Sequence, residues 1–458
     1  MASLSLTLFL LFSCFLCFIN AFLVLGFRSN FASFPVAKDV ATLQYVARVS
    51  HGSPLRPADL VVDLGGSFLW MDCDSGDVSS SNGFISSCSV NCSRAKFHEP
   101  GSKTCLLNTN CHVFPDNGVT GLTSVGELVE DIVAVDSVDR LKEGEITSVD
   151  HFLFSCAPSF HLQGLASGAK GMVGLGKSSI SLPSQLSSSI GHPQKFSLCL
   201  PSSSSSSNGV LVTGSGDTLF GAKITRSLEY TPLVIKQNGY SIHVQSIKIN
   251  GRRLGFHVEG GLEAKLSTTV PYTTMESSIY ATFCKAYVEA AALMNMTRVA
   301  TVAPFGLCFS SEGGLVPEID LVLQSEMVKW RIQGRHSMVK VSQERICLGV
   351  LDGGLEQGSP IVIGGLQMED NLLEFDLESS MLGFGSSLLL KGTTCSSSLQ
   401  DSKLKQLIPR FSGGQPLTPV AIGLPPPPRL SFLPLASLLL FIFSFGDVGD
   451  PEFFYTTL

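Results

Sequence analysis

An apolar segment that ends on glycine occurs twice in the chain, once in each half. Residues 171–176 read Gly-Met-Val-Gly-Leu-Gly, and residues 361–365 read Ile-Val-Ile-Gly-Gly. In each half, an earlier apolar segment precedes a position at which a carboxylate could lie. A repeat of this kind predicts two related lobes with a cleft between them.

The composition favours strands over helices in both lobes. Asp, Glu, Lys and Arg supply only 15% of the 458 residues, whereas β-branched apolar segments recur between glycines and serines. Residues 240–251 alternate and close on an Asn-Gly pair, which predicts a hairpin. Residues 277–293 are the exception, because their apolar side chains recur at helical spacing. The net charge of −7, without a Lys/Arg cluster, argues against nucleic acid as a partner.

The two ends of the chain differ from the lobes, which we expect at residues 34–226 and 238–395. Residues 1–26 are expected to form a secretory signal peptide, because no charged side chain occurs before Arg28; a membrane anchor is the alternative. Residues 396–458 form an atypical tail, in which four prolines precede the uncharged residues 430–445. That tail is either membrane-associated or an artefact of the reading frame.

The cysteines support secretion. Of thirteen cysteines, Cys14 and Cys17 leave with the signal peptide, and no pair of CxxC motifs is present to bind zinc. Disulfides in an oxidising compartment fit better, and neither a metal nor a cofactor is expected. Eleven is an odd number, so one thiol should be free, and Cys284 is our choice because it lies in the predicted helix. The candidate disulfide cysteines are Cys73, Cys88, Cys92, Cys105, Cys111, Cys156, Cys199, Cys308, Cys347 and Cys395.

Two asparagines begin N-glycosylation motifs, Asn91 in Asn-Cys-Ser and Asn295 in Asn-Met-Thr. Attached glycans would also be consistent with a secreted protein.

The candidate catalytic residue is Asp63, which follows an apolar segment and precedes a glycine turn. Peptide hydrolysis by paired aspartates needs two carboxylates that share one proton, about 3 Å apart, with one from each lobe. The strand before Asp63 and the glycine after it match the pattern that places a catalytic aspartate. Leu64 and Gly66, however, occupy two positions at which that pattern has a hydroxyl group to support the carboxyl. Asp74 is a poor second partner, because it belongs to the same lobe and reads as a solvated turn.

In the second lobe, the stretch that matches Asp63 and its strand is residues 264–272. Ser267 occupies the position at which the second aspartate is required, and a serine can neither share that proton nor act as the general acid. The sequence therefore predicts a broken pair in which Asp63 is a vestige.

Six motifs occur in order along residues 34–395: VDLGG at 62–66, FSCAP at 154–158, LPSQ at 182–185, VAPFG at 302–306, IDLVLQ at 319–324 and MEDN at 368–371. Together they resemble the plant extracellular dermal glycoproteins, a group that includes seed basic 7S globulins and inhibitors of microbial xylanase and xyloglucan endoglucanase. The resemblance implies a mostly β, bilobal pepsin-like aspartic protease fold with disulfides, an apoplastic location and, usually, no proteolysis.

The chain departs from this group at several positions. The first cysteine-rich loop has one pair fewer than usual, and residues 117–127 lack the flap tyrosine of active proteases. The resemblance implies that inhibitors reach into a glycosidase cleft with a histidine or arginine shortly before the last cysteine, where this chain has Lys391. The shortened loop at residues 311–314 carries no arginine either. Lys391 can supply the charge but not the bidentate fork of arginine.

These observations leave three hypotheses. The first is a secreted, proteolytically inactive protein that binds another protein in defence, such as a microbial cell-wall glycoside hydrolase, which it inhibits. The second is an active aspartic endopeptidase, which needs an unforeseen carboxylate beside Asp63. The third is a seed-storage or peptide-binding glycoprotein.

Overall fold

The computed structural model describes residues 31–73, 79–96, 108–139, 142–202, 209–214, 217–220, 222–255, 260–385, 388 and 395. All of them belong to one compact unit, Met1–Ile408. The expected signal peptide, Asp74, Cys105, Lys391 and the tail at 396–458 lie outside the described residues.

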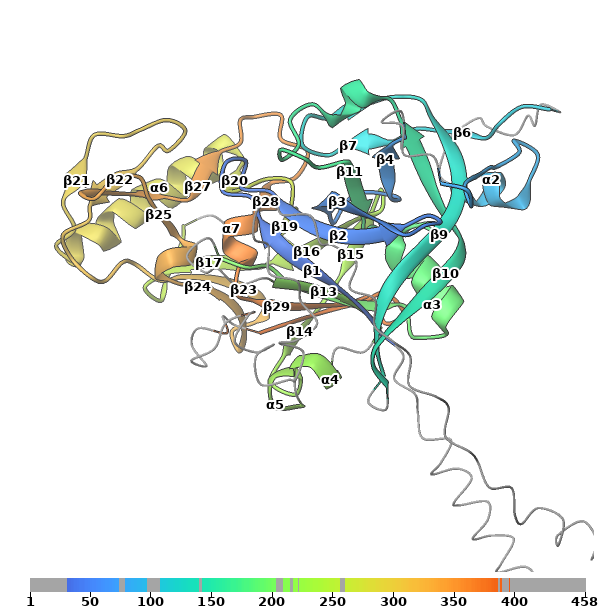
Figure 1. Cartoon of the computed structure of the whole chain (residues 1–458). Helices are drawn as coiled ribbons and strands as arrows, with labels where there is room; N and C mark the ends of the chain where they lie inside the picture. Colours follow the sequence, from blue (N-terminus) through green and yellow to red (C-terminus); the bar gives the residue numbers. More distant parts are fainter. Residues whose placement is uncertain are drawn as a thin grey trace, which may run out of the picture. The chain divides into compact units, whose positions relative to one another are not determined.

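The largest sheet, of fourteen strands, takes strands from both halves of the chain (Figure 1). Most of its strands come from the first half, but three from residues 229–384 extend it by pairing with β12 and with one another. In order, its strands are β14 (Glu229–Pro232), β30 (Met381–Phe384), β29 (Leu372–Asp376), β12 (Lys195–Cys199), β13 (Gly209–Thr213), β1 (Ala32–Lys38), β2 (Tyr45–His51), β3 (Arg56–Asp63), β11 (Gly171–Gly174), β4 (Trp70–Asp72), β10 (Lys142–Ala157), β9 (Gly126–Asp139) and β5 (Gly83–Phe84), with β6 (His112–Val113) on β9.

The second half of the chain builds three further sheets. The six-stranded sheet runs β15 (Val234–Lys236), β16 (Gly239–Val244), β19 (Leu262–Leu266), β28 (Ile361–Ile363), β20 (Thr273–Met275) and β27 (Val350–Asp352). One four-stranded sheet contains β18 (Arg252–Arg253), β17 (Ser246–Ile249), β23 (Ile319–Ser325) and β24 (Val328–Ile332). The other contains β21 (Arg298–Val299), β22 (Cys308–Ser310), β26 (Arg345–Leu348) and β25 (Met338–Lys340).

Helices are few and mostly short in the described part of the chain. They are α2 (Val90–Ala95), α3 (Leu182–Ile190), α4 (Asp217–Phe220), α5 (Ala222–Thr225), α6 (Ser277–Leu293) and α7 (Gly365–Met368), with 3-10 turns η1 (Ser159–Leu162) and η2 (Gly334–His336). The predicted helix is confirmed as α6, which buries Phe283, Tyr287, Ala290 and Ala291. None of the helices in the described ranges is long and apolar enough to cross a membrane.

The hairpin predicted at residues 240–251 is confirmed, although it is shorter than the alternating segment suggested. Asn250 and Gly251, both with positive φ, turn β17 back onto β18. The first part of the segment, β16, belongs to a different sheet. Alternation therefore identified strands, but it did not show that the chain changes sheets between them.

The predicted repeat has a structural counterpart in two parallel strand pairs. β11 lies parallel to β3, and β28 lies parallel to β19. Glycine is required in β11 because a Cβ on Gly171 would lie 2.0 Å from the backbone oxygen of Trp70. Each parallel pair delivers the end of its first strand, β3 or β19, to the region between the two halves.

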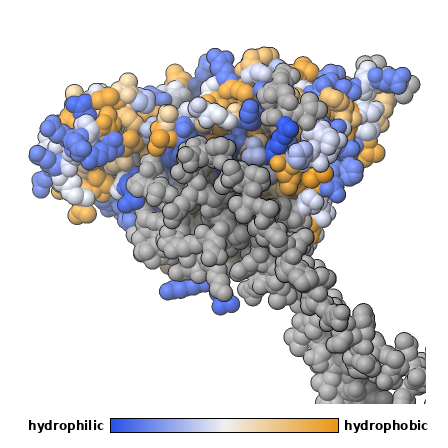
Figure 2. Space-filling view, viewed as in Figure 1, coloured by the Kyte–Doolittle hydropathy of each residue, from blue (hydrophilic) through white to orange (hydrophobic). Residues whose placement is uncertain are grey.

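Hydrophilic and hydrophobic residues are interspersed over the described part of the face drawn in Figure 2. Scattered apolar residues of this kind are normal for a protein surface.

Candidate functional site

Asp63 ends β3 and is almost fully buried, with 6% of its surface exposed. The backbone N–H of Gly65 donates a hydrogen bond to Asp63 Oδ1 over 2.8 Å. Gly66 is close on the other side, since a Cβ at that position would lie 3.2 Å from Asp63 Oδ2. The glycine turn predicted from the sequence thus packs its backbone against the carboxyl group.

A short loop between β7 (Asp116–Asn117) and β8 (Leu122–Thr123) lies over the carboxyl group of Asp63. A Cβ built on Gly118 would lie 2.5 Å from Asp63 Oδ2 and 3.2 Å from Thr269 Cγ2. The space left beside Asp63, which Asp116 and Phe114 also line, is about 20 Å³. A space of that size holds about one water molecule, so a peptide bond has no room there in this conformation.

Asn117 fixes the loop in this closed position. Its fully buried side chain donates to the backbone oxygens of His161 and Gln163 and accepts from the N–H groups of Val119 and Thr120. All these contacts lie between 2.8 and 3.1 Å. Beside this loop, the Trp70 indole N–H donates to the Asp116 backbone oxygen.

Burial raises the pKa of Asp63 to about 6, and the negative charge of Asp116 pushes it the same way. The Gly65 and Gly66 N–H groups and the positive charge of Lys265 oppose this increase. Among the described residues, no hydrogen bond joins Asp63 to another carboxyl group. A catalytic aspartate pair shares one proton between two carboxyl groups, so a second hydrogen-bonded carboxyl is the contact that such a pair would show.

The strand register places Ser267 at the position that corresponds to Asp63. In the first half, Val62 of β3 lies opposite Val173 of β11, so Asp63 follows beside Gly174. In the second half, Leu266 of β19 lies opposite Ile363 of β28, so Ser267 follows beside Gly364. Ser267 is 7% exposed, and its hydroxyl group lies 3.0 Å from that of Thr269.

Thr268 joins the two halves at this point, a role that sequence reasoning missed. Its hydroxyl group donates to the Val62 backbone oxygen over 2.6 Å and accepts from Leu64 N–H over 3.1 Å. Leu64 has no hydroxyl with which to return the contact. The threonine beside Ser267 was the available signal, but its partner could be found only from the three-dimensional fold.

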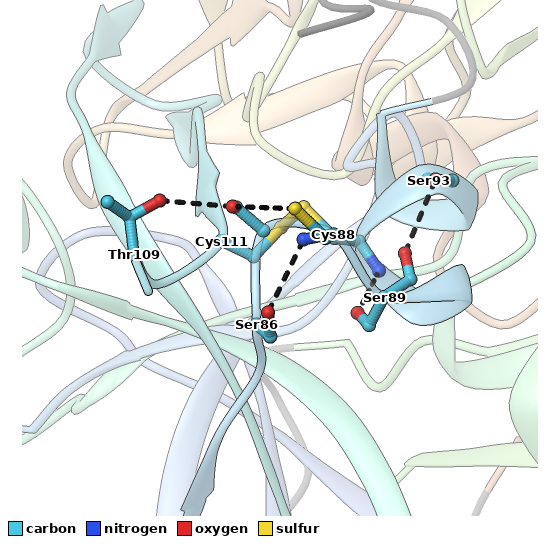
Figure 3. The surroundings of a disulfide bond; sticks show 8 residues. Ser86, Cys88, Ser89, Ser93, Thr109 and Cys111 are labelled. Carbon is cyan, nitrogen blue, oxygen red and sulfur yellow. Dashed lines mark hydrogen bonds between the residues drawn. A yellow bond between two sulfur atoms is a disulfide. The ribbon is translucent and has the colours of Figure 1, made fainter. Parts of the chain in front are cut away.

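The structure forms four disulfides among the described cysteines: Cys73–Cys156, Cys92–Cys111, Cys199–Cys395 and Cys308–Cys347. Figure 3 shows the surroundings of Cys92–Cys111, where Ser89 Oγ accepts from Cys92 N–H at the start of α2. Cys88 is also disulfide-bonded. Cys284 is a free, half-buried thiol in α6.

The two predicted glycosylation sites lie at a helix and just beyond one. Asn91 is half-buried within α2, whereas Asn295 is exposed two residues after α6 ends. Within the described ranges, no group of three His, Cys, Asp or Glu side chains is arranged to hold a metal ion.

Comparison with known proteins identifies the family. Residues 45–215 match the profile described as xylanase inhibitor N-terminal, and residues 239–386 match xylanase inhibitor C-terminal. A "Probable aspartic proteinase GIP2" of Nicotiana benthamiana is 43% identical over 407 residues, which cover 81% of this chain and 92% of the relative. The chain belongs to the xylanase inhibitor family. The resemblance stated from the six motifs is therefore confirmed.

Two further comparisons agree with this family and with the fold. Basic 7S globulin of Glycine max is 34% identical over 390 residues, covering 80% of this chain and 91% of the relative. The crystal structure of edgp superimposes with a TM-score of 0.75 at 42% identity, covering 81% of this chain and 98% of that one. The predicted mostly β, bilobal pepsin-like fold with disulfides is confirmed.

Proposed function

We propose that this protein is secreted and proteolytically inactive, and that it acts by binding another protein. The observation that carries the proposal is the unpaired carboxyl of Asp63, with Ser267 at the corresponding position of the second half. The loop at Gly118 adds to it, because it occupies the space that a scissile peptide would need. In this proposal Asp63 is a vestige and Ser267 replaces the second aspartate.

The partner that we favour is a microbial cell-wall glycoside hydrolase, a xylanase or a xyloglucan endoglucanase. Membership of the xylanase inhibitor family supports this choice. Lys391 stays the candidate inhibitory residue, because a cation placed between the two catalytic carboxylates of a glycosidase would block their work. We place the signal peptide at residues 1–26 and the lobes at 34–226 and 238–395; the disulfides support passage through an oxidising compartment toward the apoplast.

Two alternatives remain. An active endopeptidase is suggested by the name of the Nicotiana benthamiana relative, and it would require a carboxyl group to reach Asp63 after the Gly118 loop opens. A seed-storage or peptide-binding glycoprotein is suggested by the name of the soybean relative.

The experiment that separates these functions uses the secreted full-length protein with its disulfides formed. It is titrated against a panel of fungal xylanases and xyloglucan endoglucanases, and the same sample is tested for pepstatin-sensitive peptide cleavage. Stoichiometric inhibition of one hydrolase, weakened by Lys391→Ala but not by Lys340→Ala, supports the proposal and its inhibitory residue. Pepstatin-sensitive cleavage contradicts it, and inhibition unchanged by Lys391→Ala removes that lysine from the mechanism.

A further inference from the structure

A groove of about 320 Å³ lies between α6 and the β17–β18 hairpin, and it shares no residue with the space beside Asp63. One face of α6 forms its long wall, because the helix residues that line it recur three and four positions apart. These residues are Thr282, Lys285, Ala286, Glu289, Ala290 and Leu293. The groove therefore runs along the helix.

Apolar side chains form the floor of the groove and one end of it. Ile249, Leu254 and Ala290 line the groove and also belong to the main hydrophobic core, so the floor is an edge of that core. Leu293, the last residue of α6, is 85% exposed. An apolar ligand that covered Leu293 would remove its side chain from water, which favours binding.

The rim of the groove carries more positive than negative charge. The charged residues that line it are Arg252, Arg253, Lys285 and Glu289. Arg252 Nη1 lies 3.5 Å from Glu289 Oε2, and Arg253 pairs with Glu326, which does not line the groove. Lys285 is exposed and has neither an ion-pair nor a hydrogen-bond partner among the residues that the structure describes. One unpaired positive charge is therefore available beside an apolar floor.

The groove is formed before any ligand arrives. Ile249 lies opposite Arg252 in the β17–β18 register, and Arg252 reaches Glu289 on α6, so this face of the hairpin is turned toward the helix. At the turn of the hairpin, Asn250 Oδ1 accepts a hydrogen bond from Glu318 N–H over 2.8 Å. These contacts hold the hairpin beside α6, so binding would require little reorganisation.

We propose that this groove binds a linear aliphatic carboxylate, with the carboxylate at Lys285 and the hydrocarbon chain running along α6 to Leu293. Small-molecule sites measure about 300–1,000 Å³, so the groove is at the lower end of that range and suits a slender ligand. Its wall from Lys285 to Leu293 is about 12 Å long, the length of an extended chain of about ten carbons. An apolar floor with one unpaired cation matches an apolar chain with a single negative charge. The site is independent of the proposed protein-binding function.

The test follows the binding of decanoate to the full-length protein by isothermal titration calorimetry at pH 7, where the ligand is ionised. Decyltrimethylammonium has the same chain with the opposite charge, and acetate has the same charge without the chain. We expect saturable binding of decanoate alone. Lys285→Gln should weaken that binding about tenfold, whereas Lys285→Arg, which keeps the charge, should retain most of it. Ala286→Trp, which fills the groove beside Lys285, should abolish binding.

Lys340→Gln, at an exposed lysine of β25, is the matched control and should leave the affinity for decanoate unchanged. No saturable binding up to about 1 mM, equal binding of decanoate and decyltrimethylammonium, or an affinity unchanged by Ala286→Trp would each overturn the proposal. Other occupants of the groove would give different results. Binding to phospholipid vesicles without binding of decanoate would assign this face to a membrane, and a dimer that Leu293→Ser abolishes would assign it to a second copy of the chain; either result contradicts the carboxylate site.

Discussion

At the scale of single residues, Asp63 is a buried carboxyl group that accepts a hydrogen bond from the backbone of its own glycine turn. In an active aspartic protease, two carboxyl groups share one proton, and peptide hydrolysis depends on that shared proton. In the described part of the chain no second carboxyl group is hydrogen-bonded to Asp63, and burial is the main cause that raises its pKa to about 6. A raised pKa at this position is explained by burial and does not by itself indicate catalysis.

This property predicts a stability effect that depends on pH. Well below pH 3.8 the carboxyl is protonated in both the folded and the unfolded chain. As the pH rises toward 6, the unfolded chain releases the proton at its ordinary pKa of 3.8 while the folded chain retains it, so the folded state loses stability. The shift from 3.8 to about 6 corresponds to about 3 kcal/mol above pH 6.

Asp63→Asn removes that cost and keeps an oxygen to accept from Gly65 N–H. We expect this variant to unfold at a higher denaturant concentration than the wild type at pH 7 and at nearly the same concentration at pH 3.5. Glu312→Gln, at an exposed carboxyl, is the control and should show no such dependence. A stability gain that is the same at both pH values would mean that the burial of the charge is not its cause.

At the scale of elements, the loop between β7 and β8 determines how closed the site is. It has few residues and no tyrosine, and Asn117 holds it with four hydrogen bonds, of which the two to His161 and Gln163 attach it to the rest of the lobe. The Gly118 backbone can approach Asp63 because no side chain intervenes.

We predict that Asn117→Ala opens this loop. The substitution leaves buried N–H and C=O groups without partners, which costs about 1–3 kcal/mol per group where water cannot reach them. As Asp63 becomes solvated, its pKa should fall from about 6 toward 3.8, which a carbon-13 titration of labelled aspartate can follow. Asn110→Ala, which removes only a contact to Glu127, should leave that pKa in place. Faster amide exchange in residues 118–121 with an unchanged pKa would show that other residues bury Asp63.

The sequence predicted those elements whose signal is local. Helical spacing identified α6, the Asn-Gly pair identified the β17–β18 turn, and the glycine repeat identified the apolar strands β11 and β28 but not their parallel pairing. The contacts that define the site are not local: Gly118 reaches Asp63 across 55 residues, and Thr268 reaches Val62 across 206. No pattern within a short window contains that information.

At the scale of the whole molecule, a buried ionic contact joins the two halves of the chain. Lys38, on β1, forms an ion pair with Glu369, just after α7, and the Tyr45 hydroxyl donates to the same Glu369 Oε1 over 2.8 Å. The side chains of Lys38 and Glu369 are only 8% and 2% exposed. The contact adds to the β12–β29 strand pairing and the Cys199–Cys395 disulfide, which also cross between the halves.

Breaking this ion pair on one side should destabilise the protein more than removing both charges. Glu369→Gln leaves the Lys38 ammonium buried without its counter-charge, and we expect the free energy of unfolding to fall by about 3–5 kcal/mol. The double variant Lys38→Met with Glu369→Gln should recover most of that loss, because no buried charge remains and Tyr45 can still donate to the amide oxygen.

Denaturant unfolding of the single and double variants measures the coupling free energy between Lys38 and Glu369. Glu326→Gln, at the exposed pair with Lys248, provides the comparison and should have a much smaller effect. If the double variant is as unstable as Glu369→Gln, the strands and the disulfide, and not the ion pair, hold the two halves together.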